Sequence, residues 1–222
     1  MSLSRTLNTL IKDISLKTGI QTQLFFNIYP YMFQPKQLIF LTECVKAVEK
    51  VPGCFVEAGC AYGATTIFLN KFMDDEGIDR PYYAIDTFSG FVDDHAEYEI
   101  KSRGKPKGLK KYFTENKKAW FDKRTNLHGA NRVESFESDV AKFDFSSIGP
   151  IAFCLLDVDL YKPIKDVLPR VYENMSPGGI IVVDDCQAPN LWDGALQAYE
   201  EFVQQKALPN EIAVEKLGII RA

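Results

Sequence analysis

Apolar residues follow two patterns along this chain, and the two patterns alternate. Short, nearly continuous apolar runs predict buried strands, and they occupy residues 54–59, 81–86, 150–159 and 180–185. Longer segments repeat apolar residues every three or four positions and predict helices, and they occupy residues 35–51, 64–73, 162–175 and 192–205. Further short strands are expected at residues 131–139, 211–217 and 218–222.

Alternation of strands with helices is typical of an α/β fold, in which helices cover both faces of a largely parallel sheet. Two stretches interrupt the pattern. Residues 87–120 are rich in glycine and charge, and we expect an irregular segment there. The sequence SPGG at 176–179 predicts a turn before the strand at 180–185. A sheet of this kind binds its ligand at the carboxyl ends of the strands.

The composition excludes several classes of protein. The 222 residues are 46% hydrophobic and 25% charged, which is typical of a soluble globular domain. A net charge of −4 argues against a general nucleic-acid-binding surface, and no apolar stretch approaches the roughly 20 residues that cross a bilayer. Five cysteines without a CxxC pair, and only two histidines, favour neither a zinc site nor disulfides, and we expect a cytoplasmic protein.

The first predicted strand ends in EAGCAYG, which begins with Glu57. Gly59 and Gly63 permit a tight turn and close approach of a ligand, and the following helix offers free N–H groups. The spacing is not the GxGxxG of a dinucleotide site, and many such turns carry a glycine for steric reasons alone. Glu57 is more informative, because a buried carboxylate requires a partner. The cationic methionine end of S-adenosylmethionine would supply one.

Acidic residues also end the second and third predicted strands. Asp86 could accept hydrogen bonds from both ribose hydroxyls of a nucleotide, and the alternative is a turn residue. Asp139 could accept from an adenine amino group, and it could equally cap a helix. The residues themselves leave both alternatives open.

The fourth and fifth predicted strands end in Asp157-Val158-Asp159 and in Asp184-Asp185. If the two strands are neighbours, three or four carboxylates converge and either raise one another's pKa or bind a cation. Oxygen ligands alone select a hard metal such as Mg²⁺. Helix caps and structural carboxylate networks are the alternative, and two such strand ends in one sheet favour the metal.

Several residues could remove a proton in this site. Asp159, His95 and His128 are the candidate bases, although each histidine could equally be structural. The segment 101–118 carries eight Lys or Arg and one Glu. It is either a lid that meets an anionic substrate or a solvated loop that balances an acidic body, and the second interpretation is favoured.

The motifs FVEAGCAYGATTIFL, AIDTFSGF, LLDVDLYKPIKDVLPRVYENMSPGGIIVVDD and WDGALQAYEEF follow one another in this chain. In this order they resemble the macrocin O-methyltransferase (TylF-like) family, from about residue 51 to the C-terminus. The resemblance implies a Rossmann-like class I methyltransferase fold with a seven-stranded mixed sheet. It also implies S-adenosylmethionine and Mg²⁺ as cofactors and the hydroxyl of a sugar or glycosylated natural product as acceptor.

The resemblance also assigns roles to residues. Metal ligands would be Asp157, Asp184 and Asp185, with Asp157 also counted among the catalytic residues. By the same resemblance, cofactor-binding residues would be Glu57, Gly59, Tyr62, Gly63 and Asp86. Apart from the resemblance, we also expect Ser89 and Asp139 to bind the cofactor. Val158 stands where the family's DGDLY motif has a glycine, which affects the shape of this turn.

We therefore expect an N-terminal helical segment at 1–50, which covers the cofactor or forms subunit contacts, and a methyltransferase domain at 51–222. The domain would carry a basic, lid-like insertion near 90–120, and its last two strands would form an antiparallel edge. We expect a small-molecule acceptor, no nucleic acid or membrane as partner, and an arrangement compatible with a homo-oligomer. A nicotinamide-dependent Rossmann oxidoreductase, disfavoured by the missing GxGxxG, and a non-catalytic nucleotide-binding or assembly protein remain as alternatives.

Overall fold

The computed structural model of the protein describes residues 10–11, 14, 17–18 and 30–222. The chain forms two compact units, Met1–Met32 and Phe33–Ala222, and the fold described below is that of the second unit. Residues 1–9, 12–13, 15–16 and 19–29 of the N-terminal segment expected at 1–50 lie outside the described residues. Its last part, from Phe33 onward, belongs to the same compact unit as the sheet.

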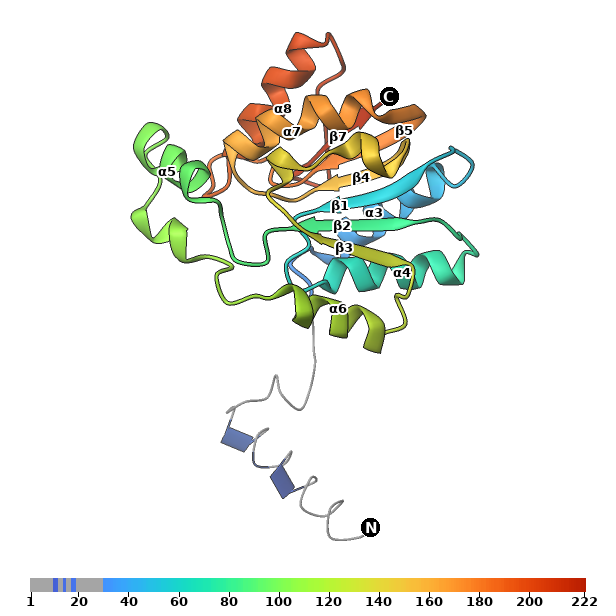
Figure 1. The fold of residues 1–222 in the computed structure, drawn as a ribbon. Coiled ribbons are helices and arrows are strands. Elements are labelled where there is room, and N and C mark those ends of the chain that lie inside the picture. The colour runs from blue at the N-terminus through green and yellow to red at the C-terminus, as the bar shows by residue number, and fades with distance from the viewer. Residues whose placement is uncertain (1–9, 12–13, 15–16, 19–29) are drawn as a thin grey trace. The chain divides into compact units, whose positions relative to one another are not determined.

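A seven-stranded mixed sheet forms the centre of this unit (Figure 1). Its strands are β1 (Cys54–Ala58), β2 (Tyr82–Asp86), β3 (Val133–Glu137), β4 (Ile151–Leu156), β5 (Met175–Val183), β6 (Glu211–Ala213) and β7 (Leu217–Arg221). Their order is β3-β2-β1-β4-β5-β7-β6. The first five are parallel, and β7 pairs antiparallel with both β5 and β6. The predicted sheet and its antiparallel edge are confirmed, and strand order reverses between β1 and β4, where open α/β sheets bind ligands.

Helices cover both faces of the sheet (Figure 1). The α-helices are α3 (Pro35–Ala47), α4 (Ala64–Asp75), α5 (Asp93–Ser102), α6 (Lys118–Leu127), α7 (Tyr161–Glu173) and α8 (Gly194–Gln205). Short 3₁₀ helices are η1 (Lys107–Lys111), η2 (Val140–Lys142) and η3 (Phe145–Ile148). In Figure 1, α7 and α8 lie on one side of the sheet, and α4 and α6 lie on the other. Within the described residues, no helix has both the length and the apolar character required to cross a bilayer.

The double cover explains the continuous apolar runs of the sequence. All six residues of β4 are fully buried, and the last four residues of β5 pair with it in the same core. The five cysteines, Cys44, Cys54, Cys60, Cys154 and Cys186, are free thiols buried within this core or at its edges. Pro169 lies inside α7 without ending the helix.

Two local predictions are wrong. Residues 87–120 are not irregular but contain α5, η1 and the start of α6. The buried side of α5 consists of His95, Ala96 and Glu99, so the helix has no apolar stripe for periodicity to reveal. The turn expected at 176–179 is instead the first part of β5, which begins at Met175 and shifts register against β4. At Gly179 a Cβ atom would lie 3.0 Å from the Ala152 carbonyl oxygen, so glycine permits this irregular pairing.

Candidate functional site

Two glycines with positive φ shape the loop between β1 and α4. Gly59 has φ +84°, and a Cβ atom there would lie 1.7 Å from the carbonyl oxygen of Asp157. Gly63 has φ +78° and is the N-cap of α4, and a Cβ atom there would lie 2.9 Å from the ring of Phe121. No described side chain caps α4, so its first N–H groups can bind a polar ligand. The packing of the chain itself therefore requires both glycines, whatever the loop binds.

Asp86, at the end of β2, holds this loop in place. Its Oδ2 accepts hydrogen bonds from the backbone N–H groups of Cys60 and Ala61, each at 2.9 Å. Its Oδ1 accepts from the N–H of Phe88 at 2.7 Å. A carboxylate offers about four acceptor positions, so three backbone bonds leave about one for a ligand such as a ribose hydroxyl. The structure gives Asp86 a loop-ordering role, and the predicted ribose contact stays a prediction.

Glu57 lies beneath the loop and is 1% exposed. Its Oε2 accepts hydrogen bonds from the Thr66 hydroxyl at 2.6 Å and from the Tyr82 hydroxyl at 2.7 Å. Burial raises the pKa of Glu57 to about 7, although both hydroxyl donors oppose this shift. The hydrogen-bond partners that the buried Glu57 carboxyl requires are thus supplied by the protein itself, through the Thr66 and Tyr82 hydroxyls. A contact between Glu57 and the methionine end of the cofactor stays a prediction.

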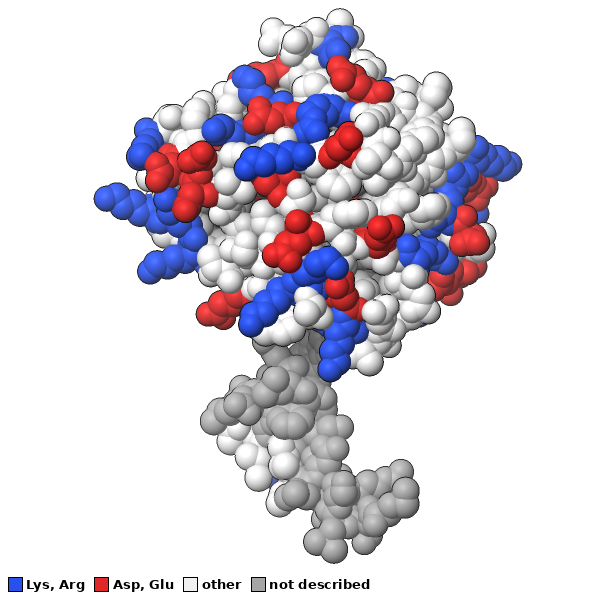
Figure 2. Space-filling model, in the orientation of Figure 1, with Lys and Arg blue, Asp and Glu red and all other residues white. Residues whose placement is uncertain are grey.

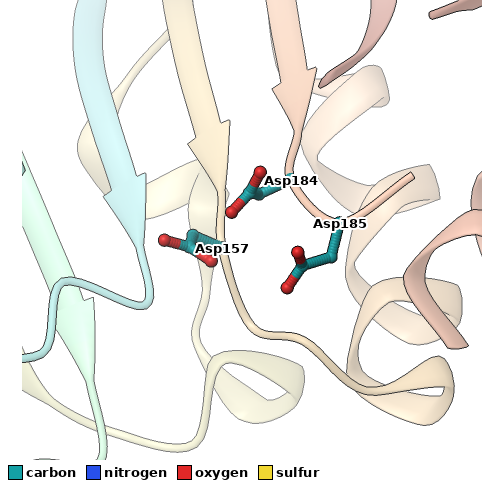
Figure 3. A group of neighbouring side chains, drawn as sticks. All are labelled: Asp157, Asp184 and Asp185. Carbon is teal, nitrogen blue, oxygen red and sulfur yellow. The ribbon is translucent and has the colours of Figure 1, made fainter. Parts of the chain in front are cut away.

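Three carboxylates meet at the carboxyl edge of the sheet (Figure 3). Asp157 directly follows β4, and Asp184 and Asp185 directly follow β5. The two strands are parallel neighbours with Leu156 opposite Val183, so their ends lie side by side. One carboxylate oxygen from each aspartate lies within 4.8 Å of the others. Three convergent oxygen ligands fit a hard divalent cation better than zinc or copper.

The electrostatics of this aspartate cluster also fit a cation. Burial and then the Asp184 carboxylate raise the pKa of Asp157 well above its usual range. Burial and the neighbouring Asp185 raise the pKa of Asp184 to about 6. The Oδ1 atom of Asp184 is buried and has no hydrogen-bond partner among the described residues. A buried, unpartnered carboxylate oxygen on a residue surrounded by like charges would be stabilised by a metal ion.

Lys216 supplies the positive charge that the structure does show at this cluster. Its Nζ atom lies 2.7 Å from Asp184 Oδ2 and 3.1 Å from Asp185 Oδ1. Burial lowers the pKa of Lys216, but the two carboxylates outweigh this effect and raise its pKa above the usual range. Lys216 is not among the residues predicted from the sequence. The available signal was the predicted antiparallel strand at the C-terminus, because the start of such a strand lies beside the end of its neighbour.

Asp159 lies next to this cluster on the loop after β4. It has φ +61°, which is uncommon outside glycine. Burial raises its pKa well above the usual range, and the Asp185 and Asp184 carboxylates add to the shift. The structure therefore brings Asp159 to the aspartate cluster, as the sequence predicts for a candidate base.

The two histidines lie in different places. His95 is 8% exposed in the first turn of α5, and burial lowers its pKa, with Asp139 and Lys162 among the charges that act on it. His128 is exposed and is the C-cap of α6, shortly before β3 begins. The start of a parallel strand is at the edge of the sheet opposite its carboxyl end. His128 therefore lies at the edge of the sheet opposite the aspartate cluster, and this position gives its predicted role as a base no support.

The remaining predicted cofactor residues lie on loops at the carboxyl edge of the sheet. The Tyr62 side chain is exposed, and its hydroxyl donates a hydrogen bond to the carbonyl oxygen of Glu115. Ser89 is exposed after β2. Asp139 accepts from the N–H of Ala141 and caps η2, which is the structural alternative considered for it. Their contacts with a cofactor stay predictions.

The basic segment 101–118 is largely neutralised by the protein itself. Its ion pairs with acidic residues of α5 and of the loop before α8 are Lys101–Glu97, Arg103–Glu99, Arg103–Asp193, Lys105–Asp193, Lys110–Asp93 and Lys110–Glu97. Acidic and basic side chains are also intermixed over the face shown in Figure 2. These pairs favour the balancing role over recruitment of an anionic substrate.

Comparison with known proteins agrees with this geometry. The sequence model of the Macrocin-O-methyltransferase (TylF) family matches residues 30–219. The 8-demethyl-8-(2,3-dimethoxy-alpha-L-rhamnosyl)-tetracenomycin-C 4'-O-methyltransferase of Streptomyces olivaceus is 28% identical over 158 residues, which cover 68% of this chain and 60% of that protein. The Mycinamicin III 3''-O-methyltransferase of Micromonospora griseorubida is 24% identical over 221 residues, covering 85% of this chain and 76% of that protein.

A solved structure confirms the fold independently. The calicheamicin methyltransferase CalS11 superposes with a TM-score of 0.71 at 21% sequence identity. The match covers 100% of this chain and 93% of that one. The seven-stranded order described above is therefore that of a Rossmann-like O-methyltransferase fold.

Proposed function

The chain belongs to the macrocin-O-methyltransferase (TylF) family of methyltransferases, and from this premise we propose that it transfers a methyl group from S-adenosylmethionine to a hydroxyl of a sugar, free or attached to a natural product. The observation that carries the proposal is the aspartate cluster Asp157, Asp184 and Asp185 beside the glycine loop of β1. Both relatives named above are O-methyltransferases by name, and the name of the first includes a rhamnosyl group. The family leaves no support for a nicotinamide-dependent oxidoreductase.

The donor would bind where strand order reverses, between the ends of β1 and β4. Gly59 keeps the loop free of a side chain on the surface toward β4. Asp86 fixes the same loop through two backbone N–H groups and retains acceptor capacity for the ribose. These residues orient the donor, and orientation is a large part of the rate in a two-substrate reaction.

A divalent cation, most simply Mg²⁺, fits Asp157, Asp184 and Asp185, and Asp184 Oδ1 is the buried atom that lacks another partner. When bound, such an ion supplies Lewis acidity toward the acceptor hydroxyl. Asp159, which lies beside the cluster on the loop after β4, would accept the hydroxyl proton.

An aromatic group provides a surface for the acceptor near this base. The ring of Trp192 lies 5.2 Å from that of Tyr112 and 5.6 Å from that of Phe91. Trp192 and Phe91 pack on a buried cluster that includes Leu160, the residue after Asp159. Tyr112 is 46% exposed. A partly exposed aromatic group that packs on the residue following a candidate base favours an acceptor with an apolar ring face.

The proposal is tested by mixing purified protein with radiolabelled S-adenosylmethionine and a panel of rhamnosyl and other deoxysugar glycosides. We expect methyl transfer to at least one member, loss of transfer after exhaustive chelation, and recovery with Mg²⁺. Asp184→Asn keeps the shape of the side chain and should lower both metal uptake and transfer, by 100-fold or so for a metal ligand. Asp75→Asn, which removes an exposed carboxylate at the end of α4, is the matched control.

The outcomes separate the alternatives. Full transfer after chelation would mean that the aspartates act as bases or caps, without a metal. Binding of S-adenosylmethionine without transfer to any hydroxyl would favour a non-catalytic nucleotide-binding protein. Absence of S-adenosylmethionine binding by calorimetry would contradict the proposed function as a whole.

A further inference from the structure

The ammonium group of Lys216 occupies the aspartate cluster as a fixed cation. It lies 2.7 Å from Asp184 Oδ2 and 3.1 Å from Asp185 Oδ1, and its side chain is 19% exposed. The Nζ atom also lies 5.1 Å from the centre of the buried Phe33 ring, a position in which an aromatic face stabilises a cation. Lys216 is therefore held in the cluster from two sides, unlike a lysine that happens to reach a surface carboxylate.

The turn that carries Lys216 is strained. Between β6 and β7, Val214 has φ +41° and Glu215 has φ +78°. A β-branched residue with positive φ is a rare outlier that persists only where the surrounding structure enforces it. Here Gln37, 2% exposed, donates to the Val214 carbonyl oxygen at 3.2 Å, and Lys36 pairs with Glu215.

The register of this turn determines what Lys216 can reach. The N–H of Cys186 donates to the carbonyl oxygen of Lys216 at 2.7 Å, so the residue lies directly beside the end of β5. Both aspartates that it contacts precede Cys186 in the chain. These contacts hold the tight turn with its two positive φ values in place. The turn in turn places the ammonium group of Lys216 beside Asp184 and Asp185.

We propose that Lys216 is an internal counter-ion that competes with the divalent cation for Asp184 and Asp185 and thereby lowers the affinity of the site. The inference rests on the metal site of the proposed function. Lys216 uses one oxygen of each aspartate and leaves Asp184 Oδ1 without a partner. A metal ion held by Asp157, Asp184 and Asp185 would therefore share two of its ligands with a neighbouring positive charge. The site would hold its ion loosely and exchange it readily with solution.

The test is calorimetric titration of the metal-free protein with Mg²⁺ and with Mn²⁺. Lys216→Met removes the charge and keeps much of the side-chain volume. Repulsion between a monovalent and a divalent cation a few ångströms apart is large even when screened, so we expect affinity to rise about tenfold or more. Lys216→Gln keeps a hydrogen-bond donor without the charge, and it should also raise the affinity for both metal ions. Lys50→Met, which removes the charge of an exposed lysine shortly after α3, is the control and should leave affinity unchanged.

Thermal unfolding provides a second readout that does not depend on activity. In EDTA, Lys216→Met should melt at a lower temperature than the wild type, because the carboxylates then lack a counter-ion. Mg²⁺ should raise its melting temperature by more than it raises that of the wild type. If Lys216→Met does not fold, the Lys216→Gln titration decides the question.

The failures are distinguishable. If the wild type binds metal and both Lys216 variants bind it with equal or lower affinity, Lys216 is not a competitor and the inference is overturned, while the proposed function stands. If neither the wild type nor any variant takes up either metal, the metal dependence of the proposed function fails, and the competition fails with it.

Discussion

Replacement of Glu57 by Gln removes a titratable carboxyl from beneath the loop between β1 and α4, and we expect it to flatten the pH dependence of stability. Burial raises the pKa of Glu57 from 4.5 to about 7 in the folded protein, with Thr66 and Tyr82 as opposing donors. Between these two pH values the folded state keeps a proton that the unfolded state releases. Glu57 therefore favours folding most below pH 4.5, and this contribution is lost as pH rises through 7.

The size of this effect follows from the shift in pKa. A change of one pKa unit corresponds to 1.36 kcal/mol, so the shift at Glu57 is equivalent to about 3 kcal/mol between acidic and alkaline conditions. Asp184 titrates in the same range, with a pKa raised to about 6, but it is present in both proteins. Its contribution cancels when the pH profile of Glu57→Gln is subtracted from that of the wild type.

The assay is urea unfolding at pH 5.0 and pH 8.5 in EDTA, with the free energy of unfolding extrapolated to water. The wild type should lose about 2.5 kcal/mol more than Glu57→Gln between the two conditions, because part of the full effect already lies below pH 5.0. Glu134→Gln, which removes an exposed carboxylate from β3, should keep the wild-type profile. Identical pH profiles for Glu57→Gln and the wild type would show that the proton on Glu57 is not linked to folding, and the reasoning from burial would then be refuted.

Three further predictions concern the loop, the basic segment and the acceptor surface. Gly59→Ala should reduce the free energy of unfolding by about 3 kcal/mol or more, because a Cβ atom there collides with the backbone. Gly77 has φ +67° and open space around it, so Gly77→Ala should reduce the free energy of unfolding by only about 1 kcal/mol. Urea unfolding measures both values. Alanine at Lys107 and Lys111, which are exposed, should leave the KM for the acceptor and its salt dependence unchanged, and a raised KM would revive the recruiting lid. Trp192→Ala should raise the acceptor KM about tenfold without changing the calorimetric affinity for S-adenosylmethionine, and an unchanged KM would remove the aromatic group from the acceptor site.

Much of the fold was predictable, because burial on both faces of a parallel sheet leaves continuous apolar runs in the sequence. The exceptions have physical causes. Helix α5 was missed since the side that it buries carries His95 and Glu99, and Glu99 is satisfied by accepting from the N–H of Tyr161 at 2.7 Å. The early start of β5 was missed since the glycines that usually indicate a turn there permit an irregular strand.

The candidate site was predictable where it depends on parallel strands and not where it depends on helices or turns. The ends of adjacent parallel strands lie at one edge, so Asp157 and Asp184 could be brought together from the sequence alone. His128 was a candidate base only because α6 was not predicted. A residue that follows this helix lies at the edge of the sheet opposite the aspartate cluster. Lys216 was missed because its position depends on the register of the β6–β7 turn, which includes a valine with positive φ that no propensity would suggest.

The five buried thiols allow the opening of this molecule to be followed in time. Reagents such as maleimides attack the thiolate, and burial raises the pKa of Cys54 to about 11 and that of Cys44 to about 12. A folded molecule is therefore nearly inert, and each labelling event records an excursion in which one element became exposed. Because the cysteines lie in α3, on β1, in its loop, on β4 and after β5, mass spectrometry of the labelled peptides would rank these elements by their local opening free energies. Addition of S-adenosylmethionine should then slow labelling first at Cys60, in the loop proposed to bind it.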